Sequence, residues 1–162
     1  MSAKKDLEGR LVDLEGKAER LEAGILMQET VQARSLSLLD PDGGIRVRAG
    51  STSEGGTELS MHDSLGEVRI GLQIGGDGTP RLGILDSKGT TRISAFLGGG
   101  EAPAIQMRDA NGKVRINIGV DPTGSPSVAL IDANGKARAL LTMNRDGGAA
   151  IYLLDENGKP TT

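Results

Sequence analysis

A 23-residue phrase that repeats along the chain constrains the fold more than any other feature of the sequence. Its aspartates are evenly spaced (63 − 40 = 23, for example), with a glycine three residues later and an arginine six residues later. The Asp and Gly positions are Asp40 and Gly43, Asp63 and Gly66, Asp86 and Gly89, Asp109 and Gly112, Asp132 and Gly135, and Asp155 and Gly158. The arginines are Arg46, Arg69, Arg92, Arg115 and Arg138. Because no insertion breaks this spacing, each phrase is predicted to be one structural unit stacked on its neighbours.

Apolar residues alternate with other residues on both sides of each Asp-x-x-Gly. In the clearest copy Ile105 and Met107 precede the Asp, and Val114, Ile116 and Ile118 follow it. A period of two predicts half-buried strands. Asp can accept a hydrogen bond from the backbone two residues on, and Gly adopts a positive φ without steric cost, so the linking residues predict a turn. Each unit is therefore expected to be a β-hairpin.

Two straight registers are open for this hairpin. Pairing Asp109 with Lys113 would place Met107 opposite Arg115, which mixes apolar and charged side chains on one face. Pairing Arg108 with Lys113 keeps one face apolar. The second register is preferred, and it puts Met107 opposite Val114, Ile105 opposite Ile116, and a four-residue loop at 109–112.

Further loops are predicted between successive units. Gly- and Pro-rich breakers occupy residues 76–80, 100–103 and 121–126. Six units then give about twelve antiparallel strands in a meander. This count treats residues 149–162 as a hairpin without a full return strand.

The N-terminal segment, residues 1–34, is predicted to be a coiled-coil oligomerisation helix. Its heptad core positions are Leu7, Leu11, Leu14, Ala18, Leu21 and Ile25. In a parallel coil Arg10 would meet Glu15 of the neighbouring chain, and Lys17 would meet Glu22. These charge pairs favour a parallel homo-oligomer. A single amphipathic helix packed on its own domain is the alternative, and the core residues do not choose between two and three chains.

Residues 35–162 are expected to form a mainly β repeat stalk that needs partner chains. A meander with one apolar face must have that face covered. Aromatic residues make up 1% of the chain, only Phe96 and Tyr152, so the shared interior is narrow and aliphatic. Three sheets around a threefold axis fit this composition, with Ile116 facing inward and Arg115 outward. The prediction is a homotrimeric β-prism-like stalk; two-sheet dimeric packing is the runner-up, and a single-chain parallel β-solenoid is third.

The Asp-x-Asn-Gly loops raise the question of calcium. The best candidate ligands are Asp109, Asn111, Asp132 and Asn134. A calcium loop of the EF-hand type needs further oxygen ligands and a late Glu, which these loops lack. Structural turns are therefore predicted, with no metal and no cofactor.

The sequence carries no convincing catalytic group. The arginine row could bind a polyanion, but pairing with the neighbouring Asp row is the preferred interpretation. His62 is the single histidine, without a second member for a triad or a zinc site. The chain is therefore expected not to be an enzyme.

Composition limits the partners and the location. The net charge of −3 gives no support to binding nucleic acid or an anionic membrane. No run of about 20 apolar residues predicts a membrane span, and the N-terminus does not resemble a signal peptide. The location is open: cytoplasmic by default, or exported or particle-associated by another route.

The Leu-x-Leu-x-Asp-x-x-Gly-x-x-Arg phrase, over residues 36–159, resembles tandem repeats of uncharacterised bacterial proteins. It differs from Tyr-Asp repeats of the Rhs type, since Tyr152 is the only tyrosine. The layout of a coil followed by repeats is similar to that of trimeric phage fibres and bacterial surface stalks. The resemblance implies a structural or adhesive role without catalytic residues. The expected function is a non-enzymatic fibre or spacer that associates with itself; the alternative is a binding module that uses the repeat face for a glycan, a polyanion or calcium.

Overall fold

The computed structural model describes residues 10–17, 32–144 and 146–161, and the chain divides into two units, 1–33 and 34–162. In the first unit residues 10–17 are helical. Lys17 Nζ donates a hydrogen bond to the Asp13 carboxylate at 2.7 Å, one helical turn away. Of the predicted coil positions, Leu7, Ala18, Leu21, Glu22 and Ile25 lie outside the described residues.

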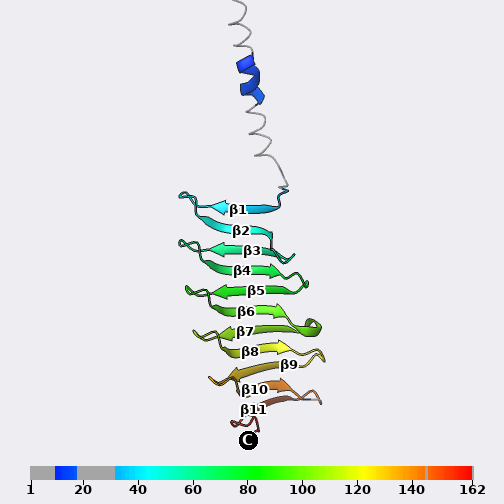
Figure 1. Cartoon of the computed structure of the whole chain (residues 1–162). Coiled ribbons are helices and arrows are strands. Elements are labelled where there is room, and N and C mark those ends of the chain that lie inside the picture. The colour runs from blue at the N-terminus through cyan, green and yellow to red at the C-terminus, as the bar shows by residue number, and fades with distance from the viewer. Residues whose placement is uncertain (1–9, 18–31, 145, 162) are drawn as a thin grey trace, which may run out of the picture. The chain divides into compact units, whose positions relative to one another are not determined.

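The second unit is one open sheet of eleven strands, each hydrogen-bonded to the next along the chain (Figure 1). The strands are β1 (Ser35–Leu39), β2 (Ile45–Ser51), β3 (Thr57–His62), β4 (Val68–Ile74), β5 (Pro80–Leu85), β6 (Thr91–Leu97), β7 (Pro103–Arg108), β8 (Val114–Val120), β9 (Pro126–Ile131), β10 (Ala137–Met143) and β11 (Ala149–Leu153). A 3-10 turn at Gly99–Glu101 links β6 to β7. The predicted antiparallel meander is confirmed. The count of twelve strands is wrong, because after β11 only the isolated bridge between Leu154 and Pro160 forms.

Each Asp-x-x-Gly closes a three-residue loop, one residue shorter than expected. In the clearest copy the Asp109 amide donates to the Lys113 carbonyl at 2.9 Å, and the Gly112 amide donates to the Asp109 carbonyl at 3.0 Å. Gly112 has a φ of 76°, a conformation that glycine adopts without steric cost. Arg108 then pairs with Val114. The preferred pairing of Arg108 with Lys113 is therefore wrong.

A β-bulge follows five of the six Asp turns, those at Asp40, Asp63, Asp86, Asp109 and Asp132, and corrects the alternation. Met107 pairs with Ile116, so Arg115 is left without a partner in the ladder. The same shift occurs in the four equivalent hairpins, and the residues passed over are Arg46, Arg69, Arg92 and Arg138. A bulge places two residues opposite one, so the charged residue leaves the ladder and the next apolar residue takes its place. Neither of the two registers considered from the sequence contains this extra residue.

The loops at the opposite ends of the strands also have three residues, but no bulge follows them. The same two backbone hydrogen bonds close loops that begin at Thr52, Gly75, Gly98, Asp121 and Asn144. The step from Asp40 to Thr52 is 12 residues (52 − 40), and the step from Thr52 to Asp63 is 11 (63 − 52). The extra residue in the longer step is the bulged arginine. One repeat is thus two strands, two equal loops and one bulge.

The pairing gathers apolar residues into three rows on one face, called here the apolar face. The middle row is Leu36, Ala49, Leu59, Leu72, Leu82, Ala95, Ile105, Ile118, Val128, Leu141 and Ile151. The row nearer the Asp turns is Leu38, Val47, Met61, Ile70, Ile84, Ile93, Met107, Ile116, Leu130, Ala139 and Leu153. The third row includes Ile74, Pro80, Leu97, Pro103, Val120, Pro126, Met143 and Ala149. The opposite face, called the polar face, carries mainly Gly, Ser, Ala, Gln, Asn and Arg.

Within the described sheet, no second layer covers the apolar face. None of the described hydrophobic residues is buried, and Ile105 and Ile118, at the centre of the sheet, remain 42% and 38% exposed. A half-apolar sheet is stable only when another layer removes that face from water. The core that the sequence predicts is therefore a surface in one chain.

The register can be tested by cross-linking, because the chain has no cysteine. Side chains directly opposite each other have Cβ atoms about 4.5–5.5 Å apart, close to what a disulfide needs. We expect the Met107→Cys, Ile116→Cys variant to form an intrachain disulfide faster than the Met107→Cys, Val114→Cys variant. Timed oxidation followed by non-reducing gel electrophoresis measures both rates. Faster disulfide formation between positions 107 and 114 would show that Met107 pairs with Val114 and that the bulge is absent.

Glu101 offers a second test of the loop geometry. It has a φ of 59° at the position where the four sibling loops carry Gly55, Gly78, Gly124 and Gly147, all at positive φ. A side chain in this conformation costs about 1 kcal/mol. We expect Glu101→Gly to raise the free energy of unfolding by up to about 1 kcal/mol in urea titrations, whereas Glu101→Gln, which keeps a side chain there, leaves it unchanged. An equal gain in both variants would assign the effect to charge instead.

Candidate assembly surface and polar hollow

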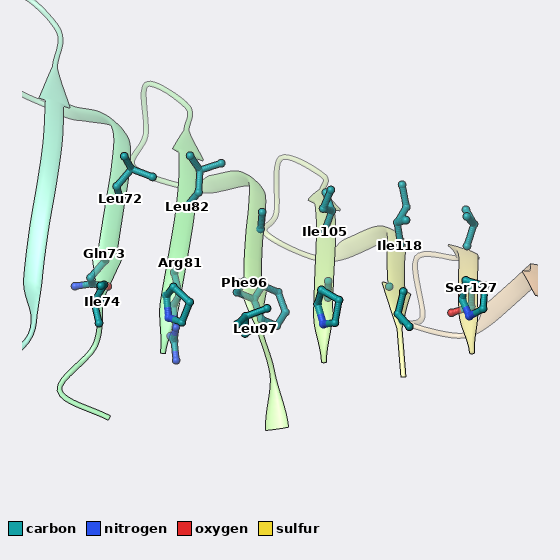
Figure 2. Close-up of a pocket in the computed structure, with 18 of the residues that line it drawn as sticks. Leu72, Gln73, Ile74, Arg81, Leu82, Phe96, Leu97, Ile105, Ile118 and Ser127 are labelled. Atoms are coloured by element: carbon teal, nitrogen blue, oxygen red, sulfur yellow. The ribbon is translucent and has the colours of Figure 1, made fainter. Parts of the chain in front are cut away.

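The apolar face forms a groove of about 1050 Å³ that runs from β3 to β11. Figure 2 shows Leu72, Leu82, Ile105 and Ile118 in one row across neighbouring strands. The third row of apolar residues, including Pro103 and Val120, lines the groove beside them. Such a surface offers aliphatic contact and no reactive group. It can pack against another apolar surface.

The five repeated arginines are held by the Asp turns. Each bulged arginine lies 2.9–4.0 Å from the carboxylate of the Asp six residues earlier. Arg69 Nε and Arg92 Nε also donate to the carbonyl groups of Leu85 and Arg108, each the last residue before the next Asp turn. The arginine row thus ties consecutive hairpins together, in agreement with the preferred pairing of the two rows. These guanidinium groups are engaged with the protein itself.

The Asp carboxylates have little capacity left for calcium. Asp132 Oδ1 accepts hydrogen bonds from the Asn134 and Lys136 amides at 2.8 and 3.0 Å, and its Oδ2 lies 2.9 Å from Arg138 Nε. At Asp109 the Asn111 and Lys113 amides occupy Oδ1 in the same way. Within residues 10–17, 32–144 and 146–161, no three His or acidic side chains cluster in a way that could hold a metal ion. The arrangement stabilises the turn.

A second depression, the polar hollow, lies on the polar face and has a volume of about 950 Å³. Its middle row runs from Ser60 through Gly71 and Gly83 to Ser94 on four successive strands. The two glycines leave the floor without side chains; a Cβ on Gly71 would meet nothing within 4 Å. Three arginines also line the hollow: Arg48 on β2, Arg81 on β5 and Arg108 on β7. Sequence analysis missed this site, although these are the strand arginines that depart from the repeat.

His62 has a partner that the sequence did not reveal. Its Nε2 lies 3.0 Å from Ser60 Oγ, and its Nδ1 lies 3.0 Å from the Gly66 carbonyl oxygen. With the proton on Nδ1 both contacts are satisfied, because the ring then donates to the carbonyl and accepts from the hydroxyl. Ser60 is only 6% exposed, so its hydroxyl cannot meet a substrate. The pair fixes one wall of the polar hollow.

The described part of the N-terminal helix presents two of the predicted core leucines. Leu11 is 58% exposed and Leu14 is 62% exposed. Arg10, Glu15 and Lys17, predicted to flank the seam, belong to the same helix. These residues are available for a partner helix.

The Asp turns make stability depend on pH. The pKa of Asp63, Asp86, Asp132 and Asp155 is lowered from 3.8, chiefly by backbone amides that donate to the carboxylate. A carboxyl group that is more acidic in the folded state stabilises the fold while ionised. That contribution is complete above the unfolded pKa and is lost as the pH falls through the lower folded values.

We therefore expect the melting temperature, followed by circular dichroism, to change little between about pH 5 and 8 and to fall below about pH 4. Asp132→Asn removes the charge beside Arg138 and should lower the melting temperature at neutral pH and weaken the acid response. Asp42→Asn, an exposed loop position whose side chain closes no turn, is the control. Identical acid curves for the Asp132 variant and the parent would refute this role.

Comparisons with known proteins do not extend these observations. No protein-family model matches the chain, and no curated protein has a similar sequence. None of the helices in the described residues is long and apolar enough to cross a membrane. The function therefore has to be argued from the exposed apolar face and the polar hollow.

Proposed function

We propose that the protein is a non-enzymatic structural or interaction protein, a homotrimeric spacer whose sheets pack their apolar faces around a shared axis. The exposed apolar face carries this proposal. It continues without interruption through eleven strands, whereas scattered single hydrophobic residues are normal on soluble proteins and contiguous patches mark interfaces.

The extent of exposure supports an obligate assembly. Large apolar residues of the sheet remain exposed from Leu36 on β1, at 47%, to Ile151 on β11, at 71%. Obligate interfaces are large and hydrophobic, and a weak or occasional contact would leave most of these side chains in water.

The distribution of aromatic residues favours three sheets. Phe96 pairs across the ladder with Arg81, and Tyr152 with Leu140, which places both aromatic residues in rows of the polar face, although Phe96 also lines the groove. The apolar face is left with aliphatic residues, Met, Pro and Ala. Three such faces enclose a narrow interior that has no room for large rings. Two-sheet packing is the runner-up.

The N-terminal heptads support a parallel arrangement of the chains. Arg10 and Lys17 flank a seam that contains Leu11 and Leu14, as a parallel coil requires for its interchain ion pairs. A parallel coil brings equivalent residues of each chain to the same height. The repeats would then meet in register, which lets identical rows of the sheets pack on one another.

The other binding roles have less support. A calcium site would have to displace the amides that occupy the Asp turns, and a polyanion along the repeats would have to displace the Asp partners of five arginines. A spacer needs only the stacked repeats and a surface through which its copies associate.

Ile118→Asp tests the assembly surface. It places a carboxylate in the middle row of the apolar face, where burial without a partner is strongly unfavourable. The parent should sediment at three times 16.8 kDa, and the variant should dissociate or unfold. Sedimentation equilibrium at micromolar concentration gives the masses, and circular dichroism reports folding.

Asn117→Asp is the matched control on the adjacent residue. Asn117 is on the polar face, and its Oδ1 accepts a hydrogen bond from Gln106 Nε2 at 3.1 Å, which an aspartate also accepts. The control should keep the mass of the parent. A folded monomeric parent would overturn the proposal, a dimeric parent would select the runner-up, and an intact Ile118→Asp trimer would show that this face is not the interface.

A further inference from the structure

We propose that the polar hollow binds an acidic oligosaccharide, a short sugar chain that bears carboxylate or sulfate groups. The hollow spans β2 to β7 on the polar face, which is opposite the surface proposed for assembly. Gln73, Arg81 and Phe96 line both the hollow and the apolar groove, because the sheet is a single layer. The ligand site goes beyond the spacer function.

The arginines of the hollow differ from the repeated arginines in one decisive respect. Every repeated arginine has an Asp partner within 4.0 Å. In the part of the sheet that the structure describes, Arg48, Arg81 and Arg108 have no ion pair within 4.0 Å, although Arg81 is close enough to help lower the pKa of Asp77. Arg108 Nη2 donates to Gln106 Oε1 at 2.6 Å, while its Nη1 is buried without a hydrogen-bond partner.

The spacing of the three cations suits a chain of anionic groups rather than a single ion. Arg48 on β2 and Arg81 on β5 are three strands apart, about 14 Å at about 4.8 Å per strand. Arg108 is two strands further, near the opposite ends of the strands. Guanidinium groups bind carboxylates and sulfates through paired hydrogen bonds. An extended ligand with separated charges can reach more than one of them.

The floor and walls suit a sugar. Gly71 and Gly83 open a depression in which a ring can approach the backbone closely. Gln73, whose side chain is exposed, supplies a neutral polar group to its lining. Phe96, the single phenylalanine, also lines the hollow and offers an apolar ring against which the C–H face of a pyranose can pack. A neutral polar side chain can hydrogen-bond to the hydroxyl groups of a sugar, and the aromatic ring can pack against the C–H face of the same sugar.

The charge of the hollow selects for moderately acidic ligands. Glu58 and Asp77 also lie at its rim, so three arginines face two carboxylates. The chain as a whole carries a net charge of −3. A densely charged polymer such as nucleic acid would be repelled over a long range. A sugar chain with widely spaced charges avoids this repulsion and still uses the arginines.

Fluorescence anisotropy with the full chain tests the site. The labelled probes are a chondroitin-sulfate tetrasaccharide (one sulfate and one carboxylate per disaccharide), tetragalacturonate (carboxylate only), maltotetraose (neutral) and a single-stranded DNA tetramer. We expect binding of at least one acidic sugar that weakens with added salt, and weaker binding of the other two classes. The two acidic probes show which anionic group the hollow prefers.

Two variants locate the binding. Gly71→Leu fills the floor without changing any charge, and it has room because its Cβ meets no atom within 4 Å. Arg81→Ser removes one exposed cation. Each should weaken binding of the acidic sugar about tenfold. For Arg81→Ser this is the loss expected for a charged hydrogen bond, and for Gly71→Leu the cause is the side chain that occupies the floor of the hollow. Lys88→Ser, which removes a positive charge at an exposed loop tip, should leave the affinity unchanged.

The outcomes separate this site from the spacer function. Absence of binding for both acidic sugars, equal affinity for the DNA probe, or unchanged affinity in Gly71→Leu would overturn the site. Equal losses in Arg81→Ser and Lys88→Ser would also overturn it, because they would indicate a diffuse charge effect. Sedimentation of the same samples reports assembly independently: a monomer that binds the acidic sugar would refute the trimer and leave the site intact.

Discussion

The β-bulge at each repeated arginine is the feature on which the rest of the sheet depends. Side chains alternate between faces with a period of two, yet the repeat has an odd length of 23 residues (63 − 40). Two strands joined by equal loops would exchange their faces in every repeat unless one residue left the ladder. Arg115 and its equivalents are that residue. The Asp turn then fixes the displaced arginine by an ion pair, so the correction is the same in each hairpin.

This regularity has a consequence for assembly. Because the same bulge recurs in these hairpins, three apolar rows extend over the sheet. The described part of the chain contains no second layer that buries them. In ordinary globular proteins the layers come from different elements of one chain. In the trimer that we propose, copies of the same sheet supply the second and third layers, and stability and self-association become one equilibrium.

The positions that depart from the repeat carry the information about binding. Repeated arginines serve the turns, and repeated apolar residues serve the shared interior. Arg48, Arg81, Arg108 and Phe96 occupy positions where other units have unlike residues, and they surround one hollow over two glycines. A repeat protein can specialise one stretch of an outer face in this way without disturbing the stacking, because each unit contacts only its neighbours.

The sequence by itself determined the turns, the strands and the single apolar face, since these follow from local conformational preference and from alternation. It also indicated the partners of the repeated arginines, because both rows share one spacing. Only the tertiary structure decided the register: the choice between Val114 and Ile116 as the partner of Met107 depends on hydrogen bonds between strands. The bulge takes Val114 out of the row that Ile116 and Ile118 share, although the three residues alternate regularly in the sequence. The polar hollow was beyond the sequence for the same reason. Its arginines are up to 60 residues apart (108 − 48), and only the accumulated registers of the intervening strands bring them to one surface.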